Sequence, residues 1–382
     1  ACTALKAAGH EAAVQAKTGL LLDPYFSATK IGWALENWPE VARAAEAGTL
    51  YAATVDAWLR WKLSSGESWE TDASNAARTL LMDLKEVRWD AGLMKMFGVP
   101  EMALPFIGDC SGALGTARIY ERDIPVTGAA GDQQAAAVGQ ACFAPGAVKA
   151  TYGTGAFLIA NAGAAVPTSD NRLLATLGWA LDGKTTYALE GSLFVAGSAV
   201  QWLRDSLGII GAAEETEALA TAADAHHGVM FVPAFAGLGA PWWDPEASGA
   251  ITGLTGGSGR AEIVHACLSS MGDQTGDVLS AMAADGVEPG VLKIDGGMVA
   301  NDWLCQDLAD ALGIEVERPE VIETTAMGAA MLAGVGAGLY GSLEDAEAAM
   351  RRVDRRFAPL TSDDERAARR ARWTDAVKKV MA

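Results

Sequence analysis

The sequence predicts an α/β protein built from two domains. The chain has 382 residues, which is more than a single hydrophobic core usually organises. Half of the residues are hydrophobic and 20% are charged, so a packed interior is expected rather than disorder. From about Ala144 onward, strand-like segments alternate with helical periodicities, which is typical of a sheet connected by crossover helices.

The first third of the chain is predicted to be mainly helical. The pattern predicts amphipathic helices around 31–38 and 54–59, a loop rich in capping residues at 71–75, a short strand at 124–127 and a helix of small residues at 133–140. After this last helix the sequence pattern changes from mainly helical to mainly strand-like. We therefore place the domain boundary near Gln140, which gives domains of residues 1–139 and 140–382.

The second part is predicted to carry most of the strands. The expected elements are a β-hairpin at 148–160, strands at 176–180 and 185–190, a helix at 196–206, a strand at 228–235, a helix at 263–282, a strand at 291–295, a helix at 303–312, a strand at 315–318 and a helix after the capping box at 362–365. The uncharged run 324–343 is rich in Ala and Gly, so we expect a helix buried against a sheet and no membrane span.

Composition excludes several classes of partner. The net charge of −19 argues against nucleic acid and against an anionic membrane surface, because either would require a basic face. It does not exclude ATP, whose phosphates need only local donors. The five cysteines are odd in number without CxxC spacing, and the four histidines are too dispersed for a structural zinc site. We expect a reduced, cytoplasmic protein with no protein-built metal site.

Asp132 is the strongest candidate for chemistry. It lies in Gly-Ala-Ala-Gly-Asp-Gln-Gln at 128–134, about twenty residues before the Thr-Tyr-Gly-Thr-Gly loop at 151–155. A carboxylate that accepts a hydroxyl proton, followed by a small-residue loop that cradles phosphates, is what phosphoryl transfer requires. From spacing alone, Asp132 could equally be a helix cap and the loop an ordinary hairpin turn.

Two further segments fit a nucleotide site less specifically. Asp-Gly-Gly at 295–297 joins a strand to a helix and permits close approach to the backbone, with Asn301 in the helix's first turn. The segment 196–201 presents small residues and one amide. Taken singly, each of these is also compatible with packing alone, as are Tyr25 and Phe157.

A series of motifs in order makes the chain resemble the FGGY carbohydrate kinase family, and within it the glycerol kinases. The matching segments are 18–27 (with Asp-Pro-Tyr-Phe-Ser), 29–30, 131–134 (Gly-Asp-Gln-Gln), 151–155, 187–191, 201–205, 237–241, 295–297 and 317–320. These segments run nearly end to end. Two of them, Asp-Pro-Tyr-Phe-Ser and Gly-Asp-Gln-Gln, favour glycerol kinases over xylulose or gluconate kinases.

The resemblance implies a fold and an activity. It implies two actin-like (ribonuclease H-like) α/β domains that close on their ligands, and ATP-dependent phosphorylation of glycerol to sn-glycerol 3-phosphate with Mg²⁺. It assigns Asp132 as the catalytic base. The residues implied to bind glycerol are Tyr25, Asp132, Gln133 and Phe157. The residues implied to line the nucleotide are Thr154, Gly197, Gln201, Gly297 and Asn301.

The sequence also departs from the family pattern. The family opens with a β-hairpin, a phosphate loop and an Arg-Glu pair, none of which matches this sequence, so we expect the first domain to lack its leading strands. On that ground we expect this polypeptide alone to be inactive and poorly soluble. As a separate expectation, the full-length form is a homo-oligomer. The alternatives are another FGGY polyol or sugar kinase, or a non-catalytic, actin-like nucleotide-binding module.

Overall fold

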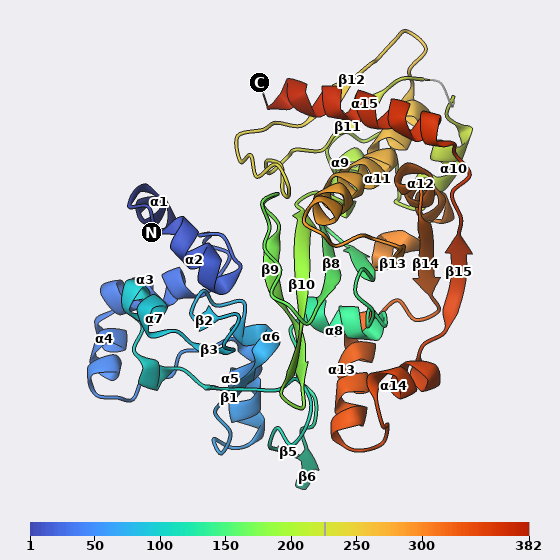
Figure 1. Cartoon of the computed structure of the whole chain (residues 1–382). Coiled ribbons are helices and arrows are strands. Elements are labelled where there is room, and N and C mark those ends of the chain that lie inside the picture. The colour runs from blue at the N-terminus through green and yellow to red at the C-terminus, as the bar shows by residue number, and fades with distance from the viewer. Residues whose placement is uncertain (225–226, 382) are drawn as a thin grey trace.

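The computed structural model describes residues 1–224 and 227–381. A seven-stranded mixed sheet stands in the middle of the molecule (Figure 1). Helices α9, α11, α12 and α15 gather at one end of this sheet, and α8, α13 and α14 lie at the other. The helices of the first third lie beside the β9 edge.

The helices are short except for α11 and α15. Their bounds are α1 (Cys2–Ala7), α2 (Glu11–Thr18), α3 (Ala28–Asn37), α4 (Pro39–Glu46), α5 (Val55–Leu63), α6 (Ala73–Ala76), α7 (Ala91–Phe97), α8 (Asp132–Gly139), α9 (Gly197–Asp205), α10 (Glu215–Ala222), α11 (Arg260–Ala284), α12 (Asp302–Leu312), α13 (Thr324–Gly336), α14 (Leu343–Met350) and α15 (Asp363–Val380), with 3₁₀ turns η1 (Glu101–Ala103) and η2 (Gly297–Ala300).

The strands fall into one large sheet and several two-stranded ones. Their bounds are β1 (Glu70–Asp72), β2 (Met82–Asp83), β3 (Arg88–Trp89), β4 (Phe106–Gly108), β5 (Thr116–Ile119), β6 (Arg122–Pro125), β7 (Val148–Tyr152), β8 (Ala156–Gly163), β9 (Leu174–Leu181), β10 (Lys184–Leu193), β11 (Met230–Val232), β12 (Ala250–Thr252), β13 (Val291–Asp295), β14 (Glu315–Pro319) and β15 (Val353–Phe357). The large sheet has the order β15-β14-β13-β7-β8-β10-β9.

The two faces of the large sheet differ in character. On one face, Val148 and Leu158 belong to an apolar core that also contains Met271 of α11. On the other face, Ile159 and Ala188 pack with Ala137 of α8. The second face therefore lies toward the segment that contains Asp132.

The two hairpins predicted in the second part are confirmed. β7 and β8 form the expected antiparallel hairpin, and β9 and β10 are joined by a turn in which Asp182 and Gly183 have φ of 50° and 71°. Such positive φ angles match the twist of hairpin strands, which explains the glycine. The capping box at Ser362 is also present, since its hydroxyl accepts from the Glu365 amide at 3.3 Å.

Four predicted elements differ from the structure. Residues 71–75 are not a loop, because β1 pairs with β4 and Asp72 caps α6. The strand predicted at 124–127 is β6, which pairs with β5 in a separate two-stranded sheet. The strand predicted at 228–235 is shorter than expected, since β11 spans only Met230–Val232. It ends before Pro233, because proline has no amide hydrogen to donate. The run 324–343 is helical only to Gly336; this helix crosses α8 directly and shares a hydrophobic cluster with Trp179 of β9.

The part that precedes α8 contains only two-stranded sheets among the described residues. It is joined to the edge of the large sheet by backbone hydrogen bonds: Ala175 donates to Gly19 at 2.9 Å, and Cys110 donates to Ala180 at 2.8 Å. No helix in the described part of the chain is long and apolar enough to cross a membrane.

Candidate functional site

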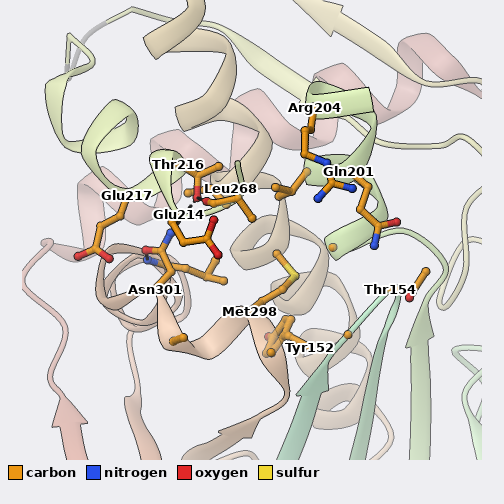
Figure 2. A pocket seen from close by; sticks show the side chains of 17 residues that line it. Tyr152, Thr154, Gln201, Arg204, Glu214, Thr216, Glu217, Leu268, Met298 and Asn301 are labelled. Carbon is orange, nitrogen blue, oxygen red and sulfur yellow. Dashed lines mark hydrogen bonds between the residues drawn. The ribbon is translucent and has the colours of Figure 1, made fainter. Parts of the chain in front are cut away.

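A cavity of about 390 Å³ opens beside the turn that joins β7 and β8. Its walls come from this turn, from α9, from the segment that leads into α10, and from η2 and α12. Figure 2 shows Gln201 and Arg204 on one side of the cavity and Glu214, Glu217 and Asn301 on the other.

The wall of the cavity at α9 depends on a close backbone contact. Thr154 accepts through its carbonyl from the Ala196 amide at 2.9 Å, and Gly153 accepts from the Gly197 amide at 2.9 Å. A Cβ on Gly197 would lie 2.6 Å from the Gly153 carbonyl oxygen. Only glycine therefore lets α9 begin against the loop.

The opposite wall is held by the start of α12. Asn301 caps this helix by accepting from the Leu304 amide at 3.0 Å, and its amide nitrogen donates to the Thr216 hydroxyl at 3.2 Å. A Cβ on Gly297 would meet no protein atom within 4 Å. Because Gly297 lines the cavity, a side chain there would project into free space rather than into the protein.

The structure brings together all five residues that the sequence connected with a nucleotide. The residues that line this one cavity include Thr154, Gly197, Gln201, Gly297 and Asn301. The sequence did not identify Glu214, Thr216 and Glu217 as cavity residues, because their pattern indicates only the start of a helix. Arg204 was part of a matching motif without an assigned role, and it is held by the Asp205 carboxylate at 2.6 Å.

Asp132 is exposed at the first turn of α8. The helix is capped by Gly131, which has no side chain, so Asp132 does not occupy the capping position. Its carboxylate accepts from the Gln133 amide at 2.7 Å, while the Gly131 amide donates to the Ser74 hydroxyl at 2.8 Å. These bonds keep the turn in place and leave the second carboxylate oxygen available.

A polar row faces Asp132 from the large sheet. In the register of β13, β7 and β8, Asp295 pairs with Thr151 and Thr151 pairs with Phe157. Phe157 is half-buried. The Asp295 carboxylate accepts from the Gln140 amide at 2.9 Å and from the Thr324 hydroxyl at 2.5 Å.

The next row of the same face contains two buried ionisable residues. Lys149 and Glu190 both pair with Ile159, from its two sides. The Lys149 ammonium donates to the side-chain oxygen of Gln133 and to the Thr151 hydroxyl at 2.9 Å. Sequence reasoning assigned no role to Lys149, because a lysine within a strand gives no sign of burial.

Tyr25 approaches this cluster from the first third of the chain. Its side chain is 61% exposed, and the Arg78 guanidinium lies 5.9 Å from its ring centroid. Arg78 forms an ion pair with Glu190 at 2.8 Å. Partial burial raises the pKa of Tyr25, which Arg78 opposes and the carboxylates of Glu190 and Asp132 reinforce. Tyr25, Asp132 and Glu190 therefore share one electrostatic environment.

The described residues do not form a metal centre by themselves. No group of three or more His, Cys, Asp or Glu side chains in residues 1–224 and 227–381 could hold an ion. Two of the four histidines do meet, with 3.0 Å between Nε2 of His227 and Nδ1 of His265, whereas His226 lies outside the described residues. Asp132 offers a single carboxylate, which fits a Mg²⁺ ion held mainly by phosphate and water.

Two domain models of one protein family match successive parts of the chain. The N-terminal domain model of the FGGY family of carbohydrate kinases matches residues 1–139, and its C-terminal domain model matches residues 148–337. The chain is 56% identical to "Glycerol kinase" of Alcanivorax borkumensis over 99% of its own length and 76% of the relative. It is 53% identical to "Glycerol kinase 1" of Pseudomonas aeruginosa over 99% of its length and 77% of the relative.

A solved structure is similar over the whole chain. The crystal structure of Plasmodium falciparum glycerol kinase with ADP superimposes with a TM-score of 0.94 at 35% identity, covering 100% of this chain and 77% of the other. The two-domain α/β architecture described above is therefore shared with that protein.

Proposed function

Because this chain belongs to the FGGY family of carbohydrate kinases, we propose that it acts as a glycerol kinase through the residues described above. The reaction transfers the terminal phosphoryl group of ATP to glycerol and yields sn-glycerol 3-phosphate and ADP. The identity of 50–56% to glycerol kinases over nearly all of the chain supports this reaction. The observation that carries the residue roles is that Tyr25, from the first third of the chain, interacts with Asp132 at the start of α8, while the next residue, Gln133, contacts Lys149 of the hairpin that borders the cavity.

Asp132 acts as the general base. Its carboxylate is exposed at the start of α8, and only one of its oxygens receives a protein hydrogen bond in the described structure. The free oxygen accepts the proton of the attacking hydroxyl of glycerol as the bond to phosphorus forms. Gln133 and Tyr25 bind the hydroxyl groups, and Phe157 packs against the carbon chain.

The cavity beside the β7–β8 turn receives the nucleotide. Thr154 offers its hydroxyl and the loop its backbone amides to the phosphates, and Gly197 and Gly297 allow the backbone to approach them. Gln201 and Asn301 offer amides to the rest of the nucleotide. Mg²⁺ would neutralise phosphate charge when bound. The chain's own residues contribute to the rate by positioning the two substrates and by accepting the proton at Asp132.

The test, here and for the variants below, is ADP release by the full-length form of the protein with ATP, Mg²⁺ and one acceptor at a time. We expect release to depend on glycerol and to exceed that with xylulose or gluconate. Faster release with either sugar would replace glycerol kinase by another kinase of the family. Calorimetric binding of ADP without turnover on any acceptor would favour the non-catalytic nucleotide-binding alternative.

A further inference from the structure

Lys149 is a fully buried cation whose ammonium contacts Gln133, the residue that follows Asp132. It lies in the middle of β7, and its side chain is completely inaccessible to solvent. Its two hydrogen-bond partners are Gln133 and Thr151, and both are neutral. Burying a lysine is costly to the fold unless neighbouring groups compensate for the loss of hydration.

Burial and nearby charges act in opposite directions on the pKa of Lys149. Burial lowers the pKa of Lys149, and the carboxylates of Asp295, Glu190 and Asp132 oppose this effect. These three carboxylates come from β13, β10 and α8, so the ammonium is surrounded by acidic groups on several elements. Among these groups, the Nζ atom of Lys149 donates a hydrogen bond to Gln133.

The charge of Lys149 determines which way the Gln133 amide faces. An ammonium has three donors and no acceptor, so it can bind only the Oε1 atom of Gln133. The NH₂ group of that amide must then point away from Lys149. Within residues 1–224 and 227–381 this NH₂ group has no protein hydrogen-bond partner, and Gln133 is partly exposed. Gln133 therefore presents the NH₂ group of its side chain, a hydrogen-bond donor, to an incoming ligand.

We propose that Lys149 is a positioning residue that fixes the polarity of substrate recognition. By holding the oxygen of Gln133, it makes this amide donate to a substrate hydroxyl, while the neighbouring Asp132 carboxylate accepts from one. A hydroxyl group can satisfy both neighbours at once, because it has one donor and two acceptor positions. This inference rests on the proposed glycerol kinase activity and adds to it the reason why a hydroxyl is preferred.

The experiment compares Lys149→Met, Gln133→Ala and the double variant by steady-state kinetics. Methionine has a similar length without charge or donors. We expect each single variant to raise KM for glycerol about tenfold, the effect of losing one oriented hydrogen bond, with KM for ATP within about twofold of the parent. The double variant should be no worse than Lys149→Met, because the lysine acts through the glutamine.

Lys293→Met is the matched control. Lys293 pairs with Lys149 in the neighbouring strand, but its ammonium donates to the backbone carbonyls of Gln140 at 2.8 Å and Ala141 at 2.9 Å. Its loss should lower the melting temperature and leave KM for glycerol unchanged. A parental KM in Lys149→Met, or effects that multiply in the double variant, would overturn the inference.

Gln133→Glu tests the same idea without altering the buried lysine. The carboxylate keeps an acceptor for Lys149 but offers no donor to the substrate. We expect an unchanged or raised melting temperature together with a KM for glycerol about tenfold higher. An unchanged KM for glycerol would contradict the proposal that the Gln133 amide donates to a substrate hydroxyl. Absence of glycerol-dependent turnover in the parent protein would instead reject the proposed function, and the inference with it.

Discussion

At the scale of single residues, the site combines side chains that hold the backbone with side chains left free for a ligand. Gly131 caps α8, and the carboxylate of Asp132 needs only one oxygen for the Gln133 amide. Asn301 uses its oxygen to cap α12 and its nitrogen to hold Thr216. The local geometry therefore survives changes that remove only the free atoms.

Asp132→Asn tests the base. Asparagine keeps an oxygen for the Gln133 amide, so the fold should persist, but an amide cannot accept a proton at neutral pH. We expect kcat to fall by about 10²–10⁴, the usual contribution of a general base. The control is Asp363→Asn, which changes the exposed first residue of α15 and should leave kcat unaltered. Turnover of Asp132→Asn within threefold of the parent would refute the assignment.

Gly297→Val tests the nucleotide cavity. The added side chain meets no protein atom within 4 Å of its Cβ, so it should fill ligand space without straining the protein. We expect ADP affinity to fall about tenfold or more, with the melting temperature of the ligand-free protein unchanged. Gly290→Val, which is equally free of neighbours but lies before β13, is the control. Calorimetry that gives equal ADP affinity for both variants would place the nucleotide elsewhere.

At the scale of elements, the position of Asp132 depends on how α8 crosses α13. A Cβ on Gly328 would lie 1.7 Å from the Ala135 carbonyl oxygen, and one on Gly139 would lie 2.0 Å from the Thr324 carbonyl oxygen. The two backbones are therefore in direct contact. Because α8 begins with Asp132 and Gln133, any separation of the two helices displaces both residues.

Gly328→Ala distinguishes helix propensity from packing. In an exposed helix this change would stabilise by about 0.5–1 kcal/mol. Here the methyl group forces the helices apart, so we expect a loss of about 1–3 kcal/mol in the free energy of unfolding and a lower kcat. Ala330→Ser adds one atom on the exposed face of the same helix and should do neither. Urea unfolding and kinetics measure both, and a stabilised Gly328→Ala would contradict the close crossing.

At the scale of the whole molecule, stability should depend on pH through a buried histidine. Burial lowers the pKa of His265 to about 4, an effect that Asp307 opposes and His227 reinforces. The ordinary value is about 6.5, so between these values the unfolded chain binds more protons than the folded one. The contribution of His265 to the free energy of unfolding is therefore fully present above pH 6.5 and is lost as the pH falls toward 4.

His265→Gln should flatten this dependence. We expect the parent's free energy of unfolding to fall between pH 7.5 and pH 5 by about 2 kcal/mol more than that of the variant. The partial exposure of the ring reduces this difference rather than reverses it. His10→Gln, in the first third of the chain, is the control and should behave as the parent does. Equal slopes for the parent and His265→Gln in urea unfolding at these two pH values would contradict the lowered pKa.

The elements that the sequence determined are those set by neighbours along the chain. The β7–β8 and β9–β10 hairpins follow from alternation around Gly-Thr-Gly and Asp-Gly turns, and the start of α15 follows from its capping box. The motif series also connected five residues with a nucleotide, and the fold gathers them around one cavity. Backbone geometry over a few residues is sufficient for such predictions.

Only the tertiary structure decided what meets across the chain. Strand register places Lys149 and Thr151 on the face toward α8, and the crossing of α8 with α13 brings Gln133 to them. Arg78 reaches Glu190 and Tyr25 from another segment. These contacts join distant parts of the chain, and their energies depend on burial and on several charges at once. No short pattern contains that information, which is why a buried lysine in β7 could not be recognised until the sheet had been assembled around it.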